Sequence, residues 1–287
     1  SDGGGVSGGL IRYLIAKLGA RKIGELGPGV SNICYPFQVA GTHDTFRPRV
    51  AFEEGLPAKA MHRENVFYDA GNGLILFRGE EPWFRIDAFG QAFFQAIKEL
   101  GIKQTVAVEG VNGPVPPDME RRITCVYSQP DMKKELERYG VQFSSYGSEG
   151  RRGPTIAMAL VAMAHYEYPD IEIFRLGAMA PMFPFVTSNN QQVGISEDHR
   201  SFYDIMRRLN DMFGLTVDLS ELREQGLAEA QQLQERLEQI SDSNPDAKQL
   251  IENARADYSY TPYVVPVEID PALDKTLEDI LRNMPES

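Results

Sequence analysis

Short runs of branched and aromatic residues alternate with helical patterns over the first two thirds of the chain. Residues 73–77 (Gly-Leu-Ile-Leu-Phe) predict a buried strand, and residues 83–100 repeat an apolar side chain every four positions, which predicts a helix. Further strands are predicted at 105–108, 123–127 and 171–176, and further helices at 132–139 and 155–165. Strand, helix and strand at this spacing predict an α/β fold with a mostly parallel sheet covered by helices on both faces.

A strongly amphipathic helix is predicted between Ser196, its N-cap, and the stop at Gly214. The chain changes character after about residue 218. Residues 219–287 hold 15 acidic and 6 basic side chains and a single glycine. Helices are predicted at 227–240, after Asn244-Pro245 and after Asp270-Pro271. We therefore predict an α/β/α core at 1–218 and a helical appendage at 219–287, packed on the core or on a neighbouring subunit.

Composition and charge argue against several classes of protein, among them nucleic-acid-binding, metal-binding and membrane-spanning proteins. The chain has 287 residues and a net charge of −12, the wrong sign for a protein that binds nucleic acid along its whole surface. Cys34 and Cys125 form no C-x-x-C pair, and the four histidines have no metal-ligand spacing, so we expect no metal and no cofactor. No apolar run is long enough for a membrane span, and no glycosylation sequon or signal peptide is visible. We expect a cytoplasmic protein with buried, reduced thiols.

The glycine-rich start, residues 3–9, fits two catalytic patterns. Gly3, Gly5 and Gly8 have the spacing of a dinucleotide-binding turn, and Gly5, Ser7 and Gly9 that of a nucleophile elbow. Both patterns need a preceding strand, which two residues cannot supply. The alternative is a tight turn before a helix at 10–18. The opening looks like a truncated start, and we expect further sequence upstream.

Two loops carry candidate binding residues. Glu80 and Glu81 follow the strand at 73–77, where open α/β sheets bind ligands, and could hold a ribose or transfer a proton. The alternative is a helix entry at Pro82. Arg151 and Arg152 lie among glycines before the helix at 155–165 and could cradle an anion. An interface salt bridge is the alternative for this loop.

The order of these features resembles the proteasome-assembly-chaperone superfamily, in particular its prokaryotic branch related to the second assembly chaperone. The resemblance covers about residues 3–222, and its most specific parts are the loop 79–82 and the ending at 214–219. The segments that carry it are the helix through Tyr13-Leu14 and Leu18-Gly19-Ala20, Phe46-Arg47-Pro48-Arg49-Val50, Leu74 to Phe84, Glu109-Gly110, Pro114 to Pro117, Glu149-Gly150, Gly153-Pro154-Thr155 and Phe213 to Leu219.

The resemblance implies a three-layer α/β/α fold, similar to nucleoside phosphorylases and hydrolases, often with a helical C-terminal extension. It also implies homo-oligomers, with trimers among bacterial members. Bacterial relatives often carry Pro-His-Thr-Arg-Pro where this chain reads Pro-Asp-Met-Glu-Arg at 117–121, and Pro-His-Tyr where it reads Ala-Pro-Met-Phe-Pro at 180–184. Any chemistry that those histidines perform in relatives is lost here.

Two hypotheses about function follow. The first is a non-catalytic assembly or interaction protein that works as a homo-oligomer, favoured as a trimer, with a protein partner. The second is an enzyme or sensor that binds a nucleoside-like or phosphorylated small molecule at the carboxyl ends of the strands. Its site would use Gly5, Ser7, Glu80, Glu81, Arg151 and Arg152. Direct docking on proteasome rings is disfavoured, because the sequence given ends without a hydrophobic–tyrosine–x motif.

Overall fold

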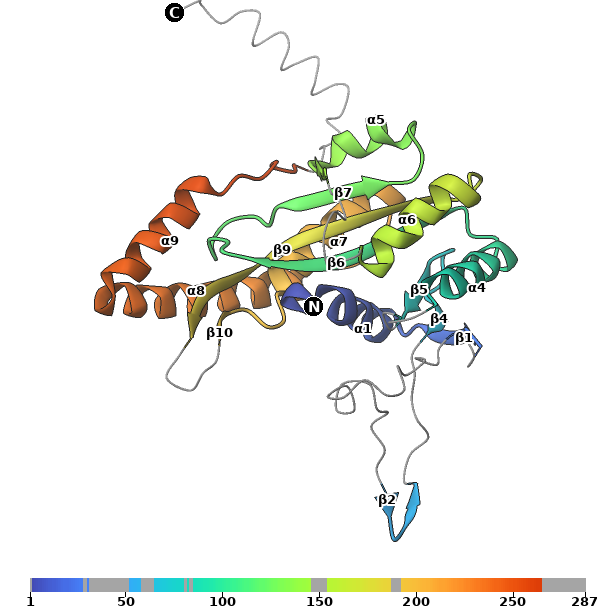
Figure 1. The fold of residues 1–287 in the computed structure, drawn as a ribbon, viewed down its shortest axis with the longest axis horizontal. Coiled ribbons are helices and arrows are strands. Elements are labelled where there is room, and N and C mark those ends of the chain that lie inside the picture. Colours follow the sequence, from blue (N-terminus) through green and yellow to red (C-terminus); the bar gives the residue numbers. More distant parts are fainter. Residues whose placement is uncertain are drawn as a thin grey trace, which may run out of the picture.

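The computed structural model describes residues 2–27, 30, 52–57, 65–79, 82, 85–145, 154–186 and 192–264. Its main sheet is built around one long strand, β9 (Glu172–Val186). Strand β6 (Gln104–Gly113) pairs with β9 in parallel, and β7 (Ile123–Tyr127) pairs with it antiparallel. Strand β8 (Gln142–Phe143) runs parallel to β7, and β10 (Gln192–Gly194) folds back on β9 (Figure 1).

The sheet is therefore mixed, and the prediction of a mostly parallel sheet is wrong for the described strands. The reason lies in the connections. Between β6 and β7 the chain has only residues 114–122, whereas a parallel crossover needs roughly a dozen residues or more. The chain turns back over that distance, so β7 runs against β6 and β9. The nine residues contain three prolines, which favour a turn over a helix.

A second, smaller sheet was not predicted as a sheet. Strands β1 (Arg21–Glu25), β4 (Val66–Asp69) and β5 (Ile75–Arg78) are antiparallel, in the order β1-β4-β5. Strands β2 (Phe52–Glu53) and β3 (Leu56–Pro57) form a separate two-stranded hairpin. Only β5 corresponds to a predicted strand, because β1 and β4 lack a clear alternation of apolar and polar residues.

Helices cover both faces of the main sheet, as predicted (Figure 1). One hydrophobic cluster joins α1 (Val6–Leu18) and α7 (His199–Phe213) to the even-numbered side chains of β9, such as Phe174 and Leu176. A second joins α4 (Ile86–Glu99) and α6 (Ile156–Glu167) to Ile173 on the other face. Short helices α5 (Met132–Leu136) and η2 (Glu137–Tyr139) follow β7, and η1 (Gly3–Gly5) precedes α1.

The C-terminal helices pack on the core. Helix α8 (Ser220–Ser243) and helix α9 (Pro245–Asp257) follow α7, and Leu233 and Leu237 of α8 are buried with Phe183 and Val193 of the β9–β10 hairpin. Asn244 caps α9 through its side chain, as predicted, whereas α8 begins seven residues earlier than predicted. The helix predicted after Asp270-Pro271 lies outside the described residues. No helix in the described ranges is both long and apolar enough to cross a membrane.

Candidate functional site

The glycine-rich start forms the turn η1 and the first residues of α1. The backbone N–H groups of Ser7 and Gly8 donate to the carboxylate of Asp2, at 2.8 and 3.0 Å. At a helix N-terminus, amides in these positions can donate hydrogen bonds to a bound phosphate. Here they donate to the chain's own carboxylate instead. Gly5 has a φ of 61°, which suits a tight turn. That Gly5 and Ser7 bind a ligand stays a prediction.

Backbone packing explains the glycines of this turn. A Cβ on Gly3 would lie 2.6 Å from the backbone N of Asn112 on β6, and a Cβ on Gly110 would lie 1.6 Å from the carbonyl oxygen of Gly3. The N–H of Asp198 donates to the carbonyl of Gly4 at 2.8 Å. The turn therefore lies directly against β6, where side chains have no room.

The four other predicted site residues, Glu80, Glu81, Arg151 and Arg152, lie outside the described residues. Whether their loops share a cavity with the glycine turn stays a prediction. Two clusters of charged side chains and a cavity stand out in the described part of the chain, and the sequence indicated none of them.

The first cluster crosses three strands of the main sheet. Glu109 on β6 and Thr124 on β7 both lie opposite Gly177 of β9. The guanidinium of Arg175 lies over Gly177, with Nε 2.7 Å from Glu109 and Nη1 2.8 Å from the hydroxyl of Thr124. A Cβ at Gly177 would fall 2.1 Å from that Nη1. The glycine therefore provides the space for a charged row that is almost fully buried, with Arg175 only 2% exposed.

The second cluster fixes the 114–122 connection to the start of α7. Arg121 and Asp198 are both completely buried and form a two-point ion pair, with Nε–Oδ2 and Nη2–Oδ1 distances of 2.8 and 3.1 Å. The hydroxyl of Ser201 donates to the same carboxylate at 2.6 Å. The remaining guanidinium nitrogen of Arg121 donates to the backbone carbonyls of Pro116, Pro117 and Met119.

Helix α7 contributes further members of this cluster. The carboxylate of Asp204 accepts from the backbone N–H of Arg121 at 2.8 Å, and it pairs with Arg200 and Arg207 on its own helix. Burial raises the pKa of Asp204, and the nearby arginines and the amide of Arg121 oppose that shift. Burial also lowers the pKa of Arg208, which donates to Glu120 at 2.9 Å.

These groups are bound to one another rather than turned toward a cavity, which is what a structural ion-pair network looks like. The i, i+4 spacing of Arg200, Asp204 and Arg208 on α7 was the available sequence signal. The partners Arg121 and Asp198 are 77 residues apart, and no local pattern joins them. The N-cap of α7 is Asp198, two residues after the predicted Ser196.

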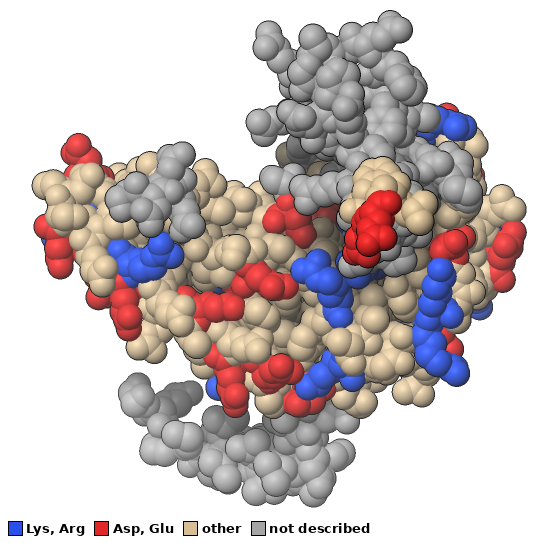
Figure 2. Space-filling view, turned by 90° about the horizontal axis from the view of Figure 1, so that it is seen from below, with Lys and Arg blue, Asp and Glu red and all other residues tan. Residues whose placement is uncertain are grey.

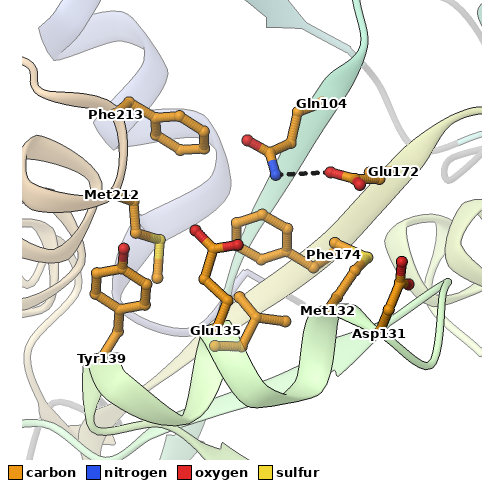
Figure 3. A pocket seen from close by; sticks show the side chains of 10 residues that line it. Gln104, Asp131, Met132, Glu135, Tyr139, Glu172, Phe174, Met212 and Phe213 are labelled. Atoms are coloured by element: carbon orange, nitrogen blue, oxygen red, sulfur yellow. Dashed lines mark hydrogen bonds between the residues drawn. The ribbon is translucent and has the colours of Figure 1, made fainter.

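The cavity, which we call the acidic pocket, lies between α5, the end of α7 and the first residues of β6 and β9 (Figure 3). Its volume is about 110 Å³. It opens at the amino ends of these two parallel strands, the edge opposite to the one the sequence indicated. Its lining comprises Gln104, Asp131, Met132, Glu135, Leu136, Tyr139, Glu172, Phe174, Met212 and Phe213.

Carboxylates surround the mouth of the pocket, and apolar side chains form its floor. The side-chain amide of Gln104 donates to Glu172 at 2.9 Å, and Glu135 projects from α5 across the opening (Figure 3). Among the described residues, no group of three or more His, Cys, Asp or Glu side chains is arranged to hold a metal ion. The pocket can therefore accept a positively charged group with an apolar stem.

The outer surface carries charges of both signs. On the face seen from below, the described Lys and Arg side chains stand among Asp and Glu side chains and do not form a continuous basic patch (Figure 2). Inside the fold, Cys125 is a free, buried cysteine, and burial raises its thiol pKa to about 12. A thiol with a raised pKa is a poor nucleophile at neutral pH. The burial of Cys125 agrees with the prediction. Cys34 lies outside the described residues.

Several solved structures share the fold, among them the following three. A proteasome-assembly chaperone homologue from Mycobacterium tuberculosis has a TM-score of 0.61 and 17% identity, covering 82% of this chain and 90% of that one. A Corynebacterium glutamicum protein of unknown function has a TM-score of 0.63 and 13% identity, covering 97% and 88%. Pyrococcus furiosus PbaA, an archaeal homologue of proteasome-assembly chaperone, has a TM-score of 0.51 and 17% identity, covering 85% and 87%.

At these identities the similarity establishes the fold alone. No curated protein matches the sequence. The sequence itself, however, matches the PAC2 family over residues 1–241, which includes the glycine turn, both sheets, the buried ion pairs and most of α8. That match covers well over half of the chain and agrees with the resemblance carried by its motifs. The chain belongs to the PAC2 family.

Proposed function

We propose that this protein is a non-catalytic, homo-oligomeric assembly or interaction protein that binds a protein partner. The observation that carries the proposal is its membership of the PAC2 family, together with a fold shared with proteins described as proteasome-assembly chaperone homologues. A trimer is the favoured oligomer, and the cytoplasm is the expected location, where a free buried thiol such as Cys125 stays reduced.

The geometry of the described residues supports this proposal. Deeply buried ionic groups such as Arg121, Asp198 and Arg175 hold segments of the fold together and do not line the acidic pocket. The acidic pocket has about 110 Å³, whereas sites for small molecules and cofactors typically have about 300–1,000 Å³. A cavity of that size suits one side chain of a protein partner better than a whole nucleotide.

Light scattering coupled to gel filtration tests the oligomeric part. A trimer should give three times the 32.1 kDa mass of the chain, and a strict monomer at micromolar concentration would remove this part of the proposal. Cross-linking followed by mass spectrometry, with partners confirmed by binding of the purified proteins, tests the other part. A thermal-shift screen with nucleosides, nucleotides and phosphate tests the small-molecule alternative, because a ligand that binds the folded state raises the melting temperature.

A further inference from the structure

We propose that the acidic pocket binds a single basic side chain, lysine or arginine, of a partner protein. This inference rests on the proposed function and specifies the chemistry that the partner must present. Three features of the described residues support it: the charge at the mouth, the apolar floor and a tyrosine hydroxyl group that faces the pocket.

The charge at the mouth is negative and uncompensated. Asp131, Glu135 and Glu172 line the pocket, and in the described part of the chain no Lys or Arg forms an ion pair with any of them. The one hydrogen bond to this group comes from Gln104, whose amide is neutral. Carboxylates that line one opening make its electrostatic potential negative, and a cation bound there lowers the electrostatic energy. The charge therefore favours a basic ligand and disfavours phosphates and acids.

The floor is built for an unbranched apolar stem. Met132, Leu136 and Phe174 are 6%, 4% and 1% exposed, and the sulfur of Met212 faces the same space (Figure 3). The ring of Phe213 borders the opening and is 38% exposed. Lysine and arginine bury their methylene stems on such surfaces, and their charged heads are attracted to aromatic faces. Two flexible methionines adapt readily to either side chain.

Tyr139 supplies the independent observation. Its side chain lines the pocket and the residue is 8% exposed, but its hydroxyl oxygen is not among the buried polar atoms and is therefore open to the pocket. In the described part of the chain this hydroxyl group makes no hydrogen bond, so it is available to a ligand. The hydroxyl points in the same direction as the carboxylate of Glu135 (Figure 3). A tyrosine hydroxyl oxygen can accept a hydrogen bond from the ammonium or guanidinium group of a ligand that enters the pocket.

Size restricts the ligand to one side chain. The volume of about 110 Å³ exceeds the roughly 30 Å³ of one water molecule several times and is far below that of a nucleoside site. The lining includes no set of three or more residues arranged to bind a metal. A basic side chain is complementary to the negative charge, the apolar floor and the Tyr139 hydroxyl group, and it fits the volume.

Methyl NMR of the full chain labelled at its methionines tests the proposal, because Met132 and Met212 report directly from the pocket. Their signals are assigned by Met132→Leu and Met212→Leu. The probes are Nα-acetyl-lysine amide, Nα-acetyl-arginine amide and, as the uncharged match, Nα-acetyl-norleucine amide. We expect the basic probes to shift these two signals in a saturable way, and norleucine to bind at least several-fold more weakly.

Two charge-removing variants distinguish binding in the pocket from nonspecific attraction to the negatively charged surface. Glu135→Gln should weaken the basic probes about two- to fivefold, whereas the control Glu137→Gln, next to the pocket on η2 and paired with Lys133, should leave them unchanged. Both side chains are exposed, so both variants should fold. Equal binding of norleucine, equal effects of the two variants, or no shift at either methionine would overturn the proposal.

A second copy of this chain is the competing occupant. Shifts of Met132 and Met212 that depend on protein concentration without any probe would place a second copy in the pocket and would refute a foreign partner. The mass of the Glu135→Gln variant, measured by light scattering, distinguishes failure of the pocket proposal from failure of the proposed homo-oligomer. If Glu135→Gln weakens probe binding and leaves the oligomer unchanged, the pocket proposal is supported. If the protein is a monomer that still binds the basic probes, only the oligomeric part of the proposed function is removed.

Discussion

Replacing Arg121 by methionine should destabilise the protein strongly. Arg121 and Asp198 are both 0% exposed, and the guanidinium makes two bonds to the carboxylate and three to backbone carbonyls of the 114–122 connection. Methionine has a comparable length but no donors. The substitution therefore leaves one carboxylate buried without its counter-charge and removes the contacts that hold the connection against α7.

The magnitude follows from this geometry. Removing one partner of a buried ion pair typically costs about 3–5 kcal/mol, because the remaining charge stays desolvated and unpaired. The hydroxyl of Ser201 still donates to Asp198 at 2.6 Å, which places the expected loss near the lower end. We expect Arg121→Met to lower the free energy of unfolding by about 3 kcal/mol, and Arg121→Met with Asp198→Leu to recover part of that loss.

Urea unfolding followed by far-ultraviolet circular dichroism measures this quantity. The matched control is Arg255→Met, which removes an Arg–Asp pair of similar two-point geometry between Arg255 and Asp118, 44% and 56% exposed at their side chains. An exposed pair contributes at most about 1 kcal/mol. A loss for Arg121→Met no larger than for Arg255→Met would refute the reasoning that burial of the Arg121–Asp198 pair sets its contribution.

Two further predictions concern the other charged contacts. Gly177→Ala should displace the guanidinium of Arg175, because the new Cβ would lie 2.1 Å from Nη1. Its melting temperature should be well below that of the control Gly24→Ala, in which the new Cβ has no atom within 4 Å. Equal melting temperatures would contradict this. The hydrogen bond to Glu229 is the main cause that raises the pKa of His199 above its ordinary value. Protonated His199 stabilises the fold fully below about pH 6.5, and this stabilisation is lost as the pH rises through the raised pKa. Between about pH 6 and pH 8.5 the urea midpoint of the parent protein should therefore fall by more than that of His199→Gln. Midpoints of the two proteins that change with pH in parallel would contradict the prediction.

Local patterns predicted most of the elements because their causes are local. The predicted strand at 123–127 is β7, the helix predicted at 155–165 corresponds to α6, and Asn244-Pro245 opens α9. Gly214 ends α7 with a φ of 59°, as its place after the last apolar residue indicated. In each case the backbone geometry needed at one position selects the residue type found there.

Strand direction could not be predicted in this way. The alternation of strands and helices favoured parallel neighbours, but the direction of β7 depends on the length and path of the 114–122 connection. The carboxyl ends of the strands were therefore a poor guide to the cavity, which lies at the amino ends of β6 and β9. The residues that line it come from segments more than a hundred positions apart, such as Gln104 and Phe213, and neither had a local signal.

The sequence by itself determined most of the helices and some of their caps, such as Asn244, as well as the absence of a redox cysteine pair and the membership of the PAC2 family, because short-range geometry and family motifs depend on neighbouring residues. The tertiary structure alone decided which charges meet. Arg121 reaches Asp198 across 77 positions, and Gly177 leaves room for Arg175 only because three strands lie side by side. Contacts of that range depend on the packed arrangement of the whole sheet, and no sequence window contains both partners.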